Sequence, residues 1–379
     1  MQILRFPWLP FASIGFCSLT FAAPPPPQAD IDKAIEKGVK VLKTHLGMAD
    51  SRKDRQLGKK DTDALVLYTL AVAKASKNLP IFDEVLKSVL AWKLDNTYCV
   101  ALLAMTLAEH DPDKYRGEIG RCAQYLVDNQ CVNGQWDYGE ETPVPDAKAF
   151  AGRQPVKTPS AAGAAAPEAT APRTAIRRRE LKVRPNGDNS NTQYALLGLR
   201  AGADAGFDAP ADTWNRALAW WTKVQRPDGG WNYGQADWLA KEGSYPGMTE
   251  GGLGSVILCL HHLRKDWGKA AAVEKANQCV AAKFSLEDNV LGREGGVKGW
   301  QYYHLYALQR AGRLAETGVF GKRDWYAEGA AYLLSKQKAD GTWLSALQNG
   351  DGICDTCFAV LFLARATRPV VYSKTATDR

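Results

Sequence analysis

Three short segments with identical spacing constrain the fold of this chain more than any other feature. In each one an apolar, helix-like run ends at a Gln, a Gly follows four residues later, and a Trp stands six residues after the Gln. The copies begin at Gln130, Gln225 and Gln337 and end at Trp136, Trp231 and Trp343. Internal repeats of this kind are typical of architectures that stack one structural unit several times.

Two kinds of predicted helix alternate between these turns. Amphipathic runs, apolar along one stripe, are expected at residues 30–46, 80–92, 113–130, 211–226, 266–283 and 322–338. Each is followed by a run that is apolar nearly all round, at residues 61–76, 96–110, 191–203, 249–264, 299–311 and 355–367. A helix that is apolar on every side has to be enclosed by other protein. Six such pairs predict an all-α fold, an α/α toroid of six inner and six outer helices.

One segment interrupts this alternation. Residues 140–188 are rich in Pro and Ala and lack apolar periodicity, which predicts a disordered insertion in the toroid domain of residues 30–367. A basic run at 173–184 closes the insertion. We interpret the run as a solvated linker that could recruit a partner, and not as a nucleic-acid site, because no aromatic residue interleaves for base stacking. A Pro-rich linker at 24–29 and a tail at 368–379 flank the domain.

The first 23 residues have the pattern of a signal peptide. Arg5 supplies positive charge, residues 11–21 are apolar, and small residues at Thr20 and Ala22 form a cleavage pattern before the prolines. The apolar stretch is shorter than the roughly 20 residues that a membrane span needs. We therefore expect an exported protein, either secreted or held in the periplasm or cell envelope, with no transmembrane span.

Seven cysteines remain once Cys17 of the predicted leader is removed. Their irregular spacing and odd number do not indicate a disulfide framework. Cys354 and Cys357 form a lone CxxC pair, which could be a bridge or half of a metal site.

The Gln-x-x-x-Gly-x-Trp turns on a double ring of helices resemble those of the terpenoid cyclase and protein prenyltransferase superfamily. The prenyltransferase and squalene-oxidase repeat proteins are the nearest match, over most of residues 30–367 apart from the insertion. The resemblance implies that the three Gln and three Trp residues tie neighbouring helices together and do not bind substrate.

The catalytic motifs of that superfamily are incomplete in this sequence. Squalene-type cyclases protonate an alkene with an Asp-x-Asp-Asp motif, and such weak bases need a strongly polarised carboxylic acid. The nearest string here is Asp61, Thr62, Asp63, Ala64, which lacks the last Asp.

Protein prenyltransferases bind zinc through an Asp-x-Cys pair and a His at the starts of inner helices. The corresponding starts here read Gly299, Trp300, Gln301 and Asp355, Thr356, Cys357. We expect no cofactor, and zinc remains an alternative that no motif supports.

Parallel inner helices would bring six N-termini to one mouth of the ring, which favours a polar or anionic ligand group. Asp61, Asp63 and Asn96 stand at inner-helix starts, where such residues also serve as caps. Trp300, Tyr302 and Tyr303 would line the lumen below the mouth.

His304 lies among these tyrosines and could act as an acid, a base or a ligand. Glu250, Asp351 and Asp355 are the carboxylates that could face the same mouth. Each also has a structural interpretation, as a helix cap, a turn residue or a core partner.

These residues are compatible with three functions. The first is binding of an isoprenoid-like or other elongated apolar ligand in an aromatic lumen, possible without turnover. The second is a polysaccharide lyase or glycoside hydrolase, which would need carboxylates, His or Tyr facing each other across the lumen. The third is a scaffold whose axis is filled with side chains.

Overall fold

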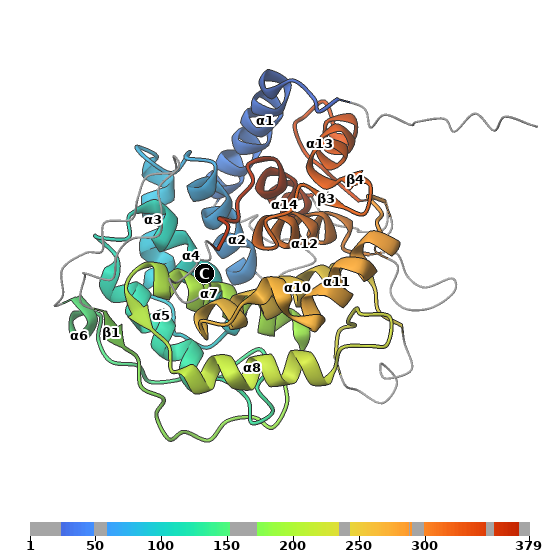
Figure 1. Cartoon of the computed structure of the whole chain (residues 1–379). Coiled ribbons are helices and arrows are strands. Elements are labelled where there is room, and N and C mark those ends of the chain that lie inside the picture. The colour runs from blue at the N-terminus through green and yellow to red at the C-terminus, as the bar shows by residue number, and fades with distance from the viewer. Residues whose placement is uncertain are drawn as a thin grey trace, which may run out of the picture.

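The computed structural model describes residues 24–48, 59–151, 173–234, 243–287, 289, 299–345 and 352–370. Over these residues the chain is a double ring of helices (Figure 1). The predicted fold class is confirmed.

Six helices form the inner ring, and each is buried nearly all round, including polar side chains such as Gln193 and Arg310. Successive inner helices contact each other, and the last contacts the first, so the ring is closed. In order they are α2 (Lys59–Val72), α4 (Thr97–His110), α7 (Asn189–Asp204), α10 (Pro246–His262), α12 (Gln301–Leu314) and α14 (Ile353–Leu363).

Six helices surround that ring. They are α1 (Gln28–Gly47), α3 (Pro80–Leu90), α5 (Arg116–Asp128), α8 (Ala211–Lys223), α11 (Ala271–Ala282) and α13 (Trp325–Lys336). Five of them bury one apolar side, whereas α5 is buried nearly all round. The predicted helix at 266–283 is divided, because Ala270 is extended between the 3₁₀ turn η1 (Trp267–Lys269) and α11. The helix predicted from residue 322 begins later, since a short hairpin precedes it.

The remaining regular elements are small. Helix α6 (Lys148–Ala151) covers part of α5. Strands β1 (Thr174–Ala175) and β2 (Phe207–Asp208) pair in parallel, and β3 (Val319–Phe320) and β4 (Arg323–Asp324) form the hairpin.

The three Gln-to-Trp turns have the same geometry. Each Gln amide donates to the carbonyl of its own turn Gly and to a carbonyl in the next outer helix around the ring. Those second acceptors are Thr213 for Gln130, Ala272 for Gln225 and Ala34 for Gln337. The second bond of each Gln therefore joins two consecutive outer helices, and the second bond of Gln337 links the C-terminal part of the chain to α1.

Each Trp of these turns joins the outer helix before it to the inner helix after it. The indole N–H of Trp231 donates to the carbonyl of Trp221, and its backbone N–H donates to the hydroxyl of Thr249. Trp136 and Trp343 repeat both bonds. Gly252 lets the Trp231 ring approach α10, because a Cβ atom there would lie 2.4 Å from the indole.

The end of the described chain crosses the ring at the C-terminal ends of the inner helices. The guanidinium of Arg200 in α7 donates to the carbonyls of Arg368 and Pro369, and Arg368 pairs with Glu109 of α4. Thr367 donates to Gln309 of α12. Residues 365–370 therefore close this end of the ring.

The basic run differs from the solvated linker expected for it. Arg178 donates to the Val127 carbonyl at the end of α5 and to Gln130, and Arg179 pairs with buried Asp128. This part of the insertion packs along α5, whereas residues 152–172 lie outside the described residues.

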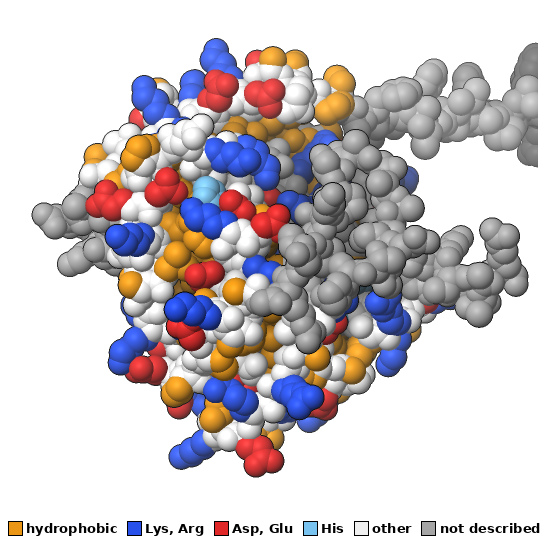
Figure 2. Space-filling view, turned by 90° about the vertical axis from the view of Figure 1, so that its left-hand side faces the viewer, with side chains coloured by type: hydrophobic (Ala, Val, Ile, Leu, Met, Phe, Trp, Pro, Cys, Tyr) orange, Lys and Arg blue, Asp and Glu red, His pale blue; other side chains and the backbone are white. Residues whose placement is uncertain are grey.

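Charges are mixed on the surface, and on the face in Figure 2 Lys and Arg lie beside Asp and Glu, with apolar atoms between them. Among the described helices none is both long and apolar enough to span a membrane.

Candidate functional site at the mouth of the ring

The inner helices begin at one end of the ring, which we call the mouth. Because inner and outer helices alternate along the chain, all inner helices run in the same direction. Side chains satisfy their first-turn amides in several places: Asn96 accepts from the Cys99 N–H, and Asp188 accepts from the Asn191 N–H. Asn96 is therefore a helix cap.

Aromatic side chains from four inner helices meet along the axis below the mouth. The ring of Tyr194 lies between Tyr98, at 4.5 Å between centroids, and Tyr303, at 6.4 Å. Phe358 packs edge-on against Tyr303 at 5.6 Å and stacks on Tyr306 at 6.0 Å. Tyr98 is half-buried at the mouth, whereas Tyr194 and Tyr306 are fully buried. The axis is thus filled with side chains at the level of Tyr306, which is deeper than the aromatic lining expected at Trp300, Tyr302 and Tyr303.

Arg310 lies at the centre of this aromatic group, with 3% of its surface exposed. Its guanidinium carbon is 4.2 Å from the ring centroid of Tyr306 and 5.4 Å from that of Tyr194. Cation–π contacts of this kind stabilise a desolvated guanidinium. Among the described residues no carboxylate forms an ion pair with Arg310, and the guanidinium instead contacts the tyrosines.

Trp300 marks the start of α12 at the mouth. It is half-buried, 6.3 Å from Tyr303 between ring centroids, and has a φ of 59°. A left-handed conformation is an outlier for a bulky residue and costs on the order of 1 kcal/mol or more. Such strain persists where the surroundings hold the residue in place.

His304 faces away from the axis, toward α10. Its Nδ1 lies 2.8 Å from Glu250 Oε2, and its Nε2 lies 2.9 Å from the Ser285 carbonyl oxygen. A carbonyl only accepts, so Nε2 carries a hydrogen, and a further proton has to lie between Nδ1 and the carboxyl group. Burial raises the pKa of Glu250, and His304 opposes that rise. Glu250 and His304 therefore form a buried pair that shares one proton and has no net charge.

The other predicted carboxylates are bound within the protein. Asp61 accepts from the Cys99 thiol at 2.8 Å, and Asp355 accepts from the Ser345 N–H at 2.8 Å. Asp63 and Asp355 are each 2% exposed. Asp351 lies outside the described residues. These contacts do not bring two carboxylates together across the axis.

Tyr302 is buried in the inner ring and lies near Asp355, where burial raises its pKa above the usual value. Tyr303 and Tyr306, one helical turn apart, face the axis. Of the residues expected to line the lumen, Trp300 and Tyr303 contact each other and belong to the aromatic group on the axis.

The donor set of a zinc site is not assembled in the described part of the chain. No three His, Cys, Asp or Glu residues there lie close enough together to hold a metal ion. The seven cysteines in this part of the chain are buried.

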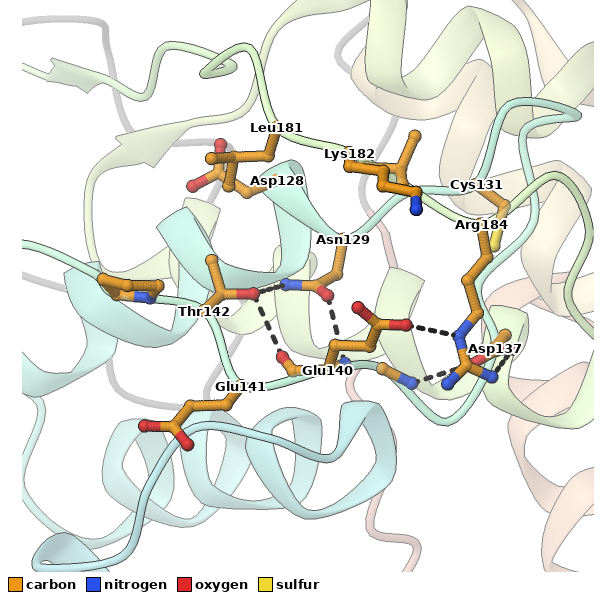
Figure 3. A pocket seen from close by; sticks show the side chains of 13 residues that line it. Asp128, Asn129, Cys131, Asp137, Glu140, Glu141, Thr142, Leu181, Lys182 and Arg184 are labelled. Atoms are coloured by element: carbon orange, nitrogen blue, oxygen red, sulfur yellow. Dashed lines mark hydrogen bonds and ion pairs between the residues drawn. The ribbon is translucent and has the colours of Figure 1, made fainter.

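A separate pocket of about 160 Å³ lies outside the ring, between the end of α5 and the two ends of the insertion (Figure 3). Arg184 pairs there with Asp137 and Glu140, and Asn129 donates to Thr142. The carboxylates of Asp137 and Glu140 therefore hold this end of the insertion in place. A larger pocket of about 290 Å³ lies at the opposite end from the mouth, where Met105 and Leu197 adjoin the charged side chains of Arg200 and Arg368.

Solved structures of a type II terpene cyclase, MstE from Scytonema, match this architecture. The complex with geranylgeranyl dihydroxybenzoate has a TM-score of 0.54 at 12% identity, over 89% of this chain and 97% of that chain. The structure without ligand has a TM-score of 0.53 at 12% identity, over 89% and 99%. This chain has the α/α toroid fold of the terpenoid cyclases. No protein-family model and no curated protein matches it.

The residues that sequence reasoning missed are Arg310, Tyr194 and Gln193, whose amide oxygen accepts from the Arg310 guanidinium. Arg310 stands seven residues after Tyr303 and four after Tyr306, so all three share one face of α12. That spacing was the available signal for a charged residue on the inward face.

Proposed function

We propose that this protein binds an isoprenoid-like, elongated apolar ligand at the mouth of the ring. The observation that carries the proposal is the aromatic group of Tyr98, Trp300 and Tyr303, which comes from two inner helices and extends from half-buried positions to the axis. Aromatic faces bury large apolar area with little loss of side-chain entropy. The terpenoid cyclase fold supports a ligand of this class, because one protein with this fold is solved with a geranylgeranyl compound.

The proposed ligand is held without cyclisation. A cyclisation cascade runs through carbocations, which an aromatic lumen can stabilise by its π faces. Here the faces of Tyr194 and Tyr306 already contact the guanidinium of Arg310. A second cation about 4 Å away would be repelled by about 4 kcal/mol at an effective dielectric constant near 20. This positive charge favours binding of an intact ligand.

The test is equilibrium binding of geranylgeraniol to the purified full chain, measured by isothermal titration calorimetry and by native mass spectrometry. Trp300→Ala should weaken binding about tenfold or more, because it removes a half-buried indole from the mouth. Trp267→Ala is the matched control, since Trp267 is half-buried in η1 of the outer ring. Absence of binding to the unsubstituted protein, or equal losses in both variants, would refute the proposal.

We also propose that the ligand is bound outside the cytoplasm, because residues 1–23 have the pattern of a signal peptide. Mass spectrometry of the protein from its own host should show a mature chain starting near residue 23 or 24. An intact Met1 in the cell-envelope and medium fractions would contradict export by this leader.

A further inference from the structure

The pocket of about 290 Å³ at the far end of the ring from the mouth is lined by both apolar and charged side chains. It lies between the C-terminal parts of α4 and α7 and residues 365–370, which close this end of the ring. Met105 and Leu197 line it and are each 7% exposed, whereas Ala104 and Leu196 beside them are 0% exposed. The exposed part of both side chains therefore faces the pocket. A cavity of about 150 Å³ is large enough for benzene, so this pocket has room for an aromatic ring with a short chain.

Small side chains on α7 leave this space open. Ala201 and Ala205 follow Leu197 at intervals of four residues, so all three lie on one side of the helix. Tyr68 of α2 also lines the pocket, and its hydroxyl lies 3.4 Å from that of Tyr306 on the axis. The two tyrosines therefore separate the pocket from the mouth.

Hydrogen-bond donors with unused capacity lie on one side of the pocket. Glu109 accepts from Lys74 and Arg368, so its carboxylate is neutralised within the protein. Among the described residues Arg368 bonds through Nη2 alone, although a guanidinium has five N–H donors. Lys77 also lines the pocket, and its side chain forms no ion pair or hydrogen bond within the described part of the chain.

Asp204 supplies an acceptor with unused capacity. Its carboxylate lies 3.7 Å from Nε of Arg200, beyond hydrogen-bond distance, because Arg200 donates to the carbonyls of Arg368 and Pro369. No other described residue donates to this carboxylate, and 46% of the side chain is exposed. Desolvation raises the pKa of Asp204 against the charge of Arg200, so a further cation would stabilise the carboxylate. His110 adds no charge at neutral pH, because burial lowers its pKa.

We infer that this pocket binds a free apolar amino acid of about the size of phenylalanine. Its ammonium group donates to Asp204, its carboxylate accepts from Lys77 and Arg368, and its side chain lies against Met105 and Leu197. An acid without the amine would place a second carboxylate beside Asp204. An amine without the acid would lie beside two cations. This ligand and the one proposed at the mouth occupy opposite ends of the ring.

The experiment compares three probes that share one apolar body. L-Phenylalanine carries both charges, 3-phenylpropionic acid lacks the amine, and 2-phenylethylamine lacks the carboxyl group. Titration calorimetry on the full chain at pH 7.5 should give phenylalanine about tenfold or more tighter binding than either analogue, as for one charge-assisted hydrogen bond. Absence of phenylalanine binding, or equal binding of the three probes, would overturn the inference.

Two variants test the charged contacts separately. Asp204→Asn should lower the advantage of phenylalanine over phenylpropionic acid to about twofold or less. Asp212→Asn is the matched control, because Asp212 lies 3.9 Å from Arg216 one helical turn away in α8. Joint substitution of Lys77→Gln and Arg368→Gln should lower the advantage over phenylethylamine in the same way. A full advantage retained in either variant would overturn the inference.

The position of the site is tested by filling the pocket. Ala201→Leu should weaken phenylalanine binding about tenfold or more, because the added carbons occupy the space of the ligand. Trp300→Ala, at the mouth, should leave phenylalanine binding unchanged. Binding that survives Ala201→Leu, or that Trp300→Ala lowers equally, would contradict a site in this pocket. If Ala201→Leu fails to fold, the result with Asp204→Asn decides.

Discussion

Glu250 and His304 lie 2.8 Å apart at the starts of two neighbouring inner helices, and neither side chain is more than 3% exposed. The Ser285 carbonyl on the far side of the imidazole requires the pair to hold a shared proton. The arrangement joins α10 to α12 on the side of the ring wall away from the tyrosines.

This pair predicts a specific pH effect for Glu250→Gln. A carboxyl group whose pKa is raised by folding favours the folded state at low pH, and this contribution is lost as pH rises through the folded pKa. In the variant, the amide donates to Nδ1, and His304 stays neutral in the folded state. Below about pH 6.5, the unfolded pKa of His, only the unfolded variant gains a proton there.

Glu250→Gln should therefore lose stability relative to the unsubstituted protein as pH falls from 6.5 to 5, by up to about 1.4 kcal/mol per pH unit. Urea denaturation of both proteins at several pH values measures the difference between their free energies of unfolding. Contributions from other groups cancel in that difference. A difference in unfolding free energy that does not change over this range would contradict the shared proton.

The Gln-to-Trp turns predict large and similar losses of stability at three distant sites. Trp231→Ala should lower the free energy of unfolding by about 3–5 kcal/mol, because the indole is fully buried and donates a hydrogen bond to α8. Trp136→Ala and Trp343→Ala should behave alike. Chemical denaturation followed by circular dichroism is the measurement, and Trp267→Ala, at a half-buried site, should lose less than half as much. A loss below 1 kcal/mol at Trp231 would show that the turn does not hold the helices together.

Residues 365–370, which close one end of the ring, are expected to be protected from amide hydrogen exchange. Arg200→Ala removes both bonds to the carbonyls of Arg368 and Pro369, and should release this segment at a cost of about 1–3 kcal/mol. Hydrogen exchange should then speed up about tenfold or more in a peptide covering 365–370 while α8 is unaffected. Unchanged exchange in that peptide would mean that other contacts hold the end of the chain.

Helix type and order were predictable because they depend on local periodicity and on turns with a repeated spacing. The hydrogen bond from Gln337 to Ala34 joins residues 303 positions apart in the sequence. The turn that positions Gln337 nevertheless consists of only seven consecutive residues. The start of α13 was misplaced, since the sequence pattern does not distinguish the β3–β4 hairpin from a first helical turn.

The site was less predictable because its contacts join distant parts of the chain. Arg310 and Gln193 are 117 residues apart, and an Arg in a helix is ordinarily expected at the surface. The basic run was interpreted as a solvated linker because no aromatic residue interleaves, whereas Arg178 bonds to the end of α5, 51 residues earlier. His304 was identified as a candidate, but its role in a buried pair depends on Glu250 in another helix.

The position of a bound ligand tests the central claim most directly. A diazirine-bearing geranylgeranyl acid, cross-linked to the full chain and mapped by peptide mass spectrometry, should label peptides at the starts of α4 and α12, including Tyr98 and Trp300. Excess geranylgeranoic acid should suppress the labelling. Labelling confined to the pocket beside Arg200 and Arg368, or labelling that the excess acid does not suppress, would contradict a ligand site at the mouth.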